Sequence, residues 1–230
     1  ASYGTSLTRG IDLAKERNKP FAINVNISDP HKPFWFDGDP HGVSRIYTAA
    51  ESPIPGFLFD DPVVRDELAL YYTSVRRADD ALGAILEALR KSGQEENTIV
   101  VFLSDHGMPL PFAKTQLYHH STRTPLMIRW PGVVTPDTVD DQHMVSAIDF
   151  LPTFCEMIGA PLPDNQQGSS FLPLLQGKNQ ADRDVVFKEY NFSPNHVINF
   201  SSWQVAGAVC ILIHDFYTTA STGVDACVIQ

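Results

Sequence analysis

The sequence has few basic residues and no long apolar segment. Lys and Arg number 17 against 27 Asp and Glu in 230 residues, so the net charge is −10. Sequence-independent nucleic-acid binding needs a basic face, and this balance counts against it. The longest apolar run is the nine residues 205–213, whereas a membrane-spanning helix needs about 20. We therefore expect neither nucleic acid nor a membrane as a partner.

Cysteine is also scarce, and the three cysteines lack a metal-binding spacing. Cys155, Cys210 and Cys227 form no CxxC pair, which argues against a zinc-thiolate site or a disulfide framework. One bridge between Cys210 and Cys227 stays open. Residue 1 is Ala rather than Met, and no signal-peptide pattern follows it. We therefore expect the numbering to begin within a processed or truncated chain.

The pattern of apolar residues indicates a globular α/β protein. Two apolar segments, 21–27 and 98–103, have the length and composition of buried strands. Between them lies a long amphipathic helix, with Asp61 at its N-cap, Pro62 in its first turn and Gly93 at its end. Strand, helix and strand predict a largely parallel mixed sheet flanked by helices. We also expect a helix over 5–17, a strand over 125–130 and a helix over 149–158 capped by Asp149.

The composition changes near residue 185. After Lys188 the chain contains no Lys or Arg, and residues 217–223 are rich in Thr, Ser and Gly. We predict two parts: residues 1–184 form the main α/β unit, and residues 185–230 are a divergent or truncated C-terminal segment.

Polar residues follow both central strands. Segment 98–103 runs into Ser104-Asp105-His106-Gly107, and segment 21–27 runs into Ser28-Asp29-Pro30-His31. Ligands of open α/β sheets bind at the carboxyl ends of the strands. The adjacent carboxylate and imidazole can bind one cation. A carboxylate favours Ca²⁺ or Mg²⁺, and the imidazole widens the choice to Zn²⁺ or Mn²⁺. The alternative, equally weighted, is that Asp105 caps a turn and His106 is an ordinary histidine.

Further cationic candidates lie downstream of this pair. Lys114 follows Asp105 by nine residues in a Pro-rich loop and can hold an anionic oxygen. The alternative for Lys114 is a solvated surface lysine. His119 and His120 are expected at solvent or at the rim of a substrate site.

With these residues in view, the sequence resembles the type I sulfatases of the alkaline phosphatase superfamily. The resemblance spans roughly residues 20–178 and is carried by DPHKP, YYTSVRRADDALGAILEALRKSGQEENTIVVFLSDHG, KTQLYHHSTRTPLMIRWPG, VSAIDFLPTFCEMIGAPLP and GSSFLPLLQG. The run GMPLPFAKTQLY is most similar to the sulfamidase, or heparan N-sulfatase, branch. The resemblance implies an incomplete fold of the alkaline phosphatase and sulfatase type.

The resemblance also implies roles for individual residues. Asp105 and His106 are two ligands of a Ca²⁺ ion, for which Mg²⁺ or Mn²⁺ are alternatives. Lys114 binds a sulfate oxygen, and His31 contacts the sulfate or the leaving group, where a histidine can act as a general acid. His119 is a further substrate-binding candidate. In such enzymes a formylglycine hydrate attacks sulfur, and the cation and cationic side chains stabilise the developing charge.

The family's nucleophile stands in a C/S-x-P-x-R motif, and none of the three cysteines of this chain fits it. Cys155 is followed by Glu-Met-Ile, Cys210 by Ile-Leu-Ile and Cys227 by Val-Ile-Gln. We therefore assign no nucleophile in this chain. We expect the formylglycine, and the paired aspartates that complete the metal site, upstream of residue 1, and we expect the isolated chain to be inactive.

Three functions are compatible with these features. The first is a sulfatase that hydrolyses sulfate esters or N-sulfo groups of a sulfated small molecule or glycan. The second is a phosphodiester or phosphonate hydrolase of the same superfamily. The third is a non-catalytic module that binds anions or carbohydrate, in which loop 28–60 stacks sugar rings on Phe34, Trp35, Phe36 and Tyr47. The resemblance alone implies a periplasmic, extracellular or lysosomal location, and the oligomeric state stays open.

Overall fold

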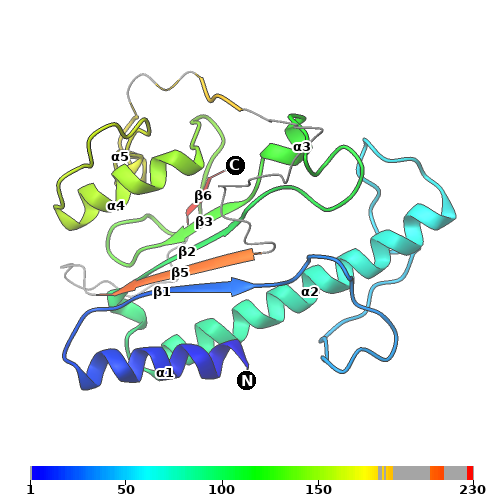
Figure 1. Cartoon of the computed structure of the whole chain (residues 1–230), viewed down its shortest axis with the longest axis horizontal. Helices are drawn as coiled ribbons and strands as arrows, with labels where there is room; N and C mark the ends of the chain where they lie inside the picture. The colour runs from blue at the N-terminus through cyan, green and yellow to red at the C-terminus, as the bar shows by residue number, and fades with distance from the viewer. Residues whose placement is uncertain (1, 181–182, 184, 189–207, 215–226, 230) are drawn as a thin grey trace, which may run out of the picture.

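Helices lie on both sides of a central sheet (Figure 1). The structure is a computed structural model that describes residues 2–180, 183, 185–188, 208–214 and 227–229, the last two ranges by backbone alone. The strands are β1 (Ala22–Ile27), β2 (Thr98–Ser104), β3 (Leu126–Arg129), β4 (Thr138–Asp140), β5 (Ala208–His214) and β6 (Cys227–Ile229). The helices are α1 (Tyr3–Glu16), α2 (Pro62–Lys91), α3 (His119–Thr122), α4 (Phe150–Ile158) and α5 (Leu172–Leu175).

Parts of the chain fall outside this description. Most of the segment 185–230 lies there, and so do the side chains of Cys210 and Cys227, whose pairing therefore stays open. Within the described residues, no helix is long and apolar enough to cross a bilayer.

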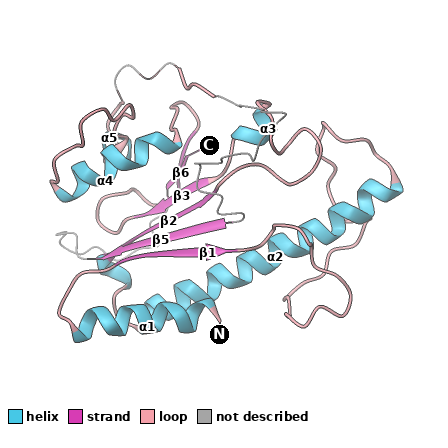
Figure 2. Cartoon of the chain, in the orientation of Figure 1, coloured by secondary structure: helices cyan, strands magenta, loops and turns pink. Residues whose placement is uncertain are grey.

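Helix α2 forms where its sequence signals predict it. The Asp61 carboxylate accepts a hydrogen bond from the backbone N–H of Val63 at 2.9 Å, which caps the helix start. The helix continues for 30 residues to Lys91, and Gly93 follows with φ of +73°, a conformation that glycine adopts without strain. Figure 2 shows α2 as the longest element, extending past the end of the sheet.

Strand β2 is packed on both faces, which creates two cores. Val100 and Phe102 belong to the core between the sheet and the helix pair α1–α2. Ile99 and Val101 point to the other core, which contains α4 and α5. Alternate residues of a strand point to opposite faces, so an apolar run such as TIVVFL is typical of a strand covered on both sides.

The direction of the strands corrects one prediction. Strands β1 and β2 run in the same direction, as expected from the strand–helix–strand order, but β5 lies between them and pairs antiparallel with both. Strand β2 also pairs antiparallel with β3, and β3 with β6; among the described pairs only β4 and β6 are parallel. The expectation of a largely parallel sheet is therefore wrong for the described residues, because a strand from the C-terminal segment separates β1 from β2.

Asp149 has a different role from the predicted cap of α4. It ends a 3₁₀ turn (Ala147–Asp149), and its buried carboxylate accepts hydrogen bonds from the backbone N–H groups of Ser146 and Ser169 at 2.7 and 2.8 Å. Arg183 donates to both of its oxygens at 2.9 and 2.7 Å. The carboxylate thus ties three separate chain segments together, a contact that local sequence cannot reveal.

Two glycines of the α1–α2 pair are expected to respond to alanine in opposite ways. A Cβ on Gly4 would lie 2.8 Å from the Ala84 carbonyl oxygen, whereas a Cβ on Gly83 would meet nothing within 4 Å. Gly4→Ala should lower the free energy of unfolding by about 1–3 kcal/mol through overpacking. Gly83→Ala should raise it by about 0.5–1 kcal/mol through helix propensity. Urea unfolding measures both, and a shift of the same sign in the two variants would contradict the close helix crossing.

Candidate active site

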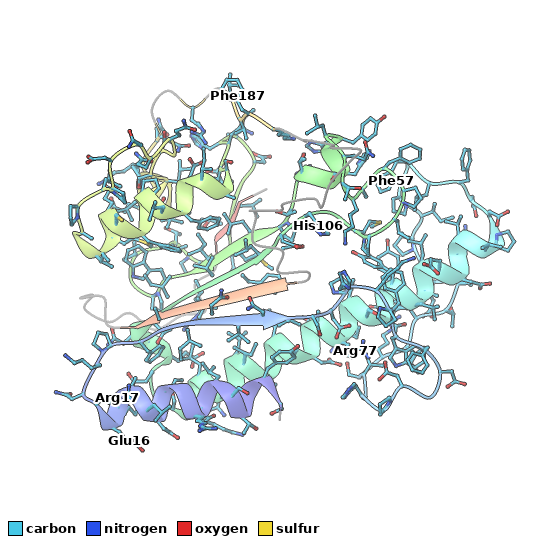
Figure 3. All side chains as sticks on the ribbon, in the orientation of Figure 1. Glu16, Arg17, Phe57, Arg77, His106 and Phe187 are labelled. Carbon is cyan, nitrogen blue, oxygen red and sulfur yellow. The ribbon has the colours of Figure 1, made fainter. Side chains whose placement is uncertain are left out.

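The two loops that carry the predicted site residues leave the sheet at the same edge. Ala208 of β5 pairs with Ile27 at the end of β1 and with Ser104 at the end of β2. Since neighbouring strands are about 4.8 Å apart, these two strand ends are about 10 Å apart. Figure 3 shows His106 close to this edge of the sheet.

Asp105 and His106 form a compact pair directly after β2. The backbone N–H of His106 donates to Asp105 Oδ1 at 2.9 Å, and His106 Nδ1 lies 2.7 Å from the Gly107 carbonyl oxygen. The second carboxylate oxygen, Oδ2, lies 3.4 Å from His106 Nε2. Both side chains are largely covered, with exposures of 16% for Asp105 and 32% for His106.

This geometry suits a shared cation. The Gly107 carbonyl only accepts hydrogen bonds, so its contact assigns the proton of the neutral imidazole to Nδ1 and leaves a lone pair on Nε2. Nε2 and Oδ2 are then two acceptors that face each other, and a cation between them satisfies both. Two ligands at right angles on an ion with bonds of about 2.4 Å are about 3.4 Å apart. The described residues hold no group of three or more His, Cys, Asp and Glu side chains that could bind a metal ion, so the pair offers at most two ligands.

The turn that follows the pair depends on a glycine. A Cβ on Gly107 would lie 1.9 Å from the His120 carbonyl oxygen and 2.6 Å from that of Ala113. The Gly107 N–H donates to the Ser121 carbonyl oxygen at 3.0 Å. The segment 105–107 is therefore pressed against the start of α3, and only glycine permits this approach.

The remaining predicted residues do not contact the pair through any described hydrogen bond or ion pair. Lys114 is half-buried in the loop between β2 and α3, and within the described residues its ammonium forms no ion pair. His31 is exposed, with Nδ1 at 2.5 Å from the Lys32 carbonyl oxygen. His119 is exposed and lies 3.5 Å from Arg123 through Nε2 and Nη1. No described hydrogen bond or ion pair links any of these side chains to Asp105 or His106.

The aromatic residues expected to stack sugars from loop 28–60 are mostly occupied elsewhere. Phe34 is 7% exposed and packs in a third core with Leu68 of α2. Tyr47 is half-buried against Tyr72, with ring centroids 6.3 Å apart, and Trp35 is half-buried. Only Phe36 is markedly exposed, at 51%. The four residues therefore do not form one exposed platform.

Arg77 of α2 anchors the loop that carries His31, a role that the sequence analysis did not identify. Its Nε and Nη2 donate to the two oxygens of Asp29 at 2.8 and 2.7 Å, and its Nη1 donates to Asp39 at 2.6 Å. The three side chains are 16%, 12% and 7% exposed. Asp29 lies two residues before His31, so this bidentate pair fixes the base of the loop that carries His31. The sequence signal for this ion-pair network was weak, since it consisted of two Asp residues near a Pro-rich turn.

The hydrogen bonds of this network shift the pKa of Asp39 down and that of Arg77 up. The hydrogen bond from the backbone N–H of His41, followed by that from Arg77, lowers the pKa of Asp39 below its ordinary value of 3.8. Hydrogen bonds to Asp29 and then Asp39 raise the pKa of Arg77 against the effect of burial. Because the folded pKa of Asp39 is depressed, its stabilising contribution is present above pH 3.8 and is lost as the pH falls through the lower folded value.

Comparisons with known proteins agree with the resemblance. The model of the family described as Sulfatase matches residues 4–160. A second model, described as N-sulphoglucosamine sulphohydrolase, C-terminal, matches residues 105–222. The second match continues beyond residue 184 into the segment 185–230, whose composition differs from the rest of the chain.

Individual relatives are sulfatases of animals and bacteria. An ulvan-active sulfatase of Formosa agariphila is 29% identical over 199 residues, which cover 71% of this chain and 33% of that protein. N-sulphoglucosamine sulphohydrolase of Homo sapiens is 29% identical over 193 residues, which cover 72% and 38%. The solved structure of a sulfatase candidate, yidJ of Bacteroides fragilis, covers 77% of this chain and 41% of its own, with a TM-score of 0.61 and 27% identity. The chain thus spans 33% to 38% of these two curated relatives.

Replacing the glycine beneath α3 should displace the Asp105–His106 turn. Gly107→Ala places a methyl group into the His120 carbonyl, so we expect a loss of about 1–3 kcal/mol in the free energy of unfolding. Gly56→Ala is the control, because its Cβ would meet nothing within 4 Å. Thermal unfolding compares the two, and equal melting temperatures would show that the turn does not need glycine.

Removing the Arg77 guanidinium should leave two covered carboxylates without their cation. We expect Arg77→Gln to lower the free energy of unfolding at pH 7 by roughly 2–4 kcal/mol. The free energy of unfolding of this variant should also change less as the pH falls below 3.8, because Asp39 loses one of the groups that lower its pKa. Arg90→Gln is the matched control on the same helix, since Arg90 is 59% exposed in its pair with Glu87. Similar stability of the two variants in urea would contradict the role of the network.

Proposed function

The chain belongs to the sulfatase family, and on that premise we propose that residues 1–230 provide the cation-binding and sulfate-binding part of a sulfatase catalytic domain. The observation that carries this proposal is the pair of facing acceptors, Asp105 Oδ2 and His106 Nε2, 3.4 Å apart after β2. The complete protein then hydrolyses sulfate esters or N-sulfo groups, with a sulfated glycan as substrate. The names of the relatives, one ulvan-active and one acting on N-sulphoglucosamine, support a glycan.

The residues of this chain have distinct proposed roles. Asp105 and His106 hold a Ca²⁺ ion from one side, with Mg²⁺ or Mn²⁺ as alternatives, and further ligands complete the site. Lys114 donates hydrogen bonds to a sulfate oxygen. This role is supported by the fact that its ammonium forms no ion pair among the described residues. His31 protonates the leaving group, and its exposed position at the same sheet edge supports access to substrate. His119, exposed beside Arg123, contacts the outer part of the substrate.

The reaction also needs groups that we place outside residues 1–230. The cation supplies positive charge beside the sulfate, and formylglycine supplies the nucleophilic oxygen. None of the three cysteines stands in a C-x-P-x-R motif, so we propose that the formylglycine residue precedes this segment. We further propose that residues 185–230 extend the catalytic domain in divergent form and, on the resemblance, that the protein acts in a periplasmic, extracellular or lysosomal compartment.

The proposed cation site is tested by calorimetric titration of the chain with CaCl₂. Two protein ligands are expected to give a dissociation constant of about 10⁻³ M. Asp105→Asn should weaken this binding by about tenfold or more, because the amide lacks the negative charge. Asp140→Asn is a matched control, since Asp140 also pairs with a histidine, His143, with Oδ2 and Nδ1 2.8 Å apart. Equal effects of the two substitutions, or none for Asp105→Asn, would reject the site.

The absence of a nucleophile is tested with an aryl sulfate. The chain with saturating CaCl₂ should release no phenol above the buffer rate, while inorganic sulfate still binds. Lys114→Ala should weaken that sulfate binding. Appreciable turnover by residues 1–230 would place the nucleophile within this chain and overturn the proposal.

A further inference from the structure

Two exposed aromatic residues flank Lys114 in sequence, in the segment between β2 and α3. Phe112 is 49% exposed and Tyr118 is 55% exposed. Their rings meet edge to face, with centroids 6.0 Å apart and an interplanar angle of 70°. Lys114 lies two residues after Phe112 and four before Tyr118. Large apolar side chains with this much exposure are candidates for contact with a ligand.

The loop holds these rings outward from a fixed base. Ala113 is fully buried and Leu110 is 9% exposed, and the Ala113 N–H donates to the Leu110 carbonyl oxygen at 3.1 Å. Phe112 has φ of +68° and Thr115 has φ of +55°. This region is unfavourable for aromatic and β-branched residues and persists where the surrounding structure imposes it. Phe112 is therefore exposed at a backbone conformation that the surrounding structure must hold in place.

Other exposed aromatic residues lack the same setting. Phe59 is 83% exposed in the segment before α2, and Phe36 is 51% exposed after β1. Neither Phe59 nor Phe36 lies within four residues of Lys114, whereas Phe112 and Tyr118 do. Phe57 is stacked on His120, with centroids 4.1 Å apart, so this face of its ring is already covered. Figure 3 shows Phe57 near α3.

We propose that Phe112 and Tyr118 form a subsite for the ring of a sulfated sugar whose sulfate is held by Lys114. A pyranose ring presents C–H groups on its face, and these pack against aromatic rings, while the sulfate requires a cation. An exposed aromatic pair and a lysine from the same short segment offer one group for each part of such a ligand. The inference rests on the proposed function, because Lys114 is the sulfate-binding group in both.

The subsite is tested by calorimetry on the chain with two probes in the presence of CaCl₂. The probes are inorganic sulfate, whose proposed binding does not involve the aromatic rings, and an N-sulfated glucosamine disaccharide, which also presents sugar rings. Phe112→Leu and Tyr118→Leu keep apolar bulk but remove the aromatic face. Each should raise the dissociation constant of the disaccharide by about tenfold and leave that of sulfate unchanged. Tyr118→Phe should bind like the wild type, and so should the control Phe59→Leu.

The outcomes separate this inference from the proposed function. If Lys114→Ala leaves sulfate binding intact, the proposed sulfate site itself is wrong. If Lys114→Ala abolishes sulfate binding while both leucine variants bind the disaccharide normally, only the aromatic subsite is wrong. An equal loss for sulfate and disaccharide in the leucine variants would assign the rings a structural role and also overturn the inference.

Discussion

The packing of β2 on both faces is the constraint on which the rest of the structure depends. Val100 and Phe102 pack toward α1 and α2, and Ile99 and Val101 pack toward α4 and α5. A strand held from both sides has little freedom to slide, because a shift by one residue would exchange its two faces. The point where the strand ends, and therefore the position of Asp105, is set by these two cores.

The loops at this edge are attached to the fold by charge and backbone contacts in addition to the apolar burial of Phe34 and Leu110. Arg77 binds Asp29 and Asp39, and three residues earlier on α2 the Ser74 hydroxyl accepts a hydrogen bond from the Trp35 N–H at 2.7 Å. On the other side, the N–H of Gly107 binds the start of α3. Such contacts fix direction as well as distance, which a site for a small anion and a cation requires.

Much of the architecture could be predicted from local patterns. The cap at Asp61, the apolar run of β2 and the αL glycine at Gly159, with φ of +65°, each specify an element through interactions within a few residues. The pair Asp105–His106 could also be predicted from the sequence, because its two members are adjacent and follow a clear strand. The antiparallel insertion of β5 was not, since strand order depends on hydrogen bonds between residues more than 100 positions apart.

The sequence by itself determined the family, the main helices and strands, and the identity of the residues that follow β1 and β2. Motifs and periodicity depend on near neighbours, so they survive without knowledge of the fold. Only the tertiary structure decided that Phe34 is buried while Phe112 and Tyr118 are exposed, and that Arg77 supports the loop of His31. Burial and ion pairing arise from segments that are distant along the chain, and no local pattern records which of them meet.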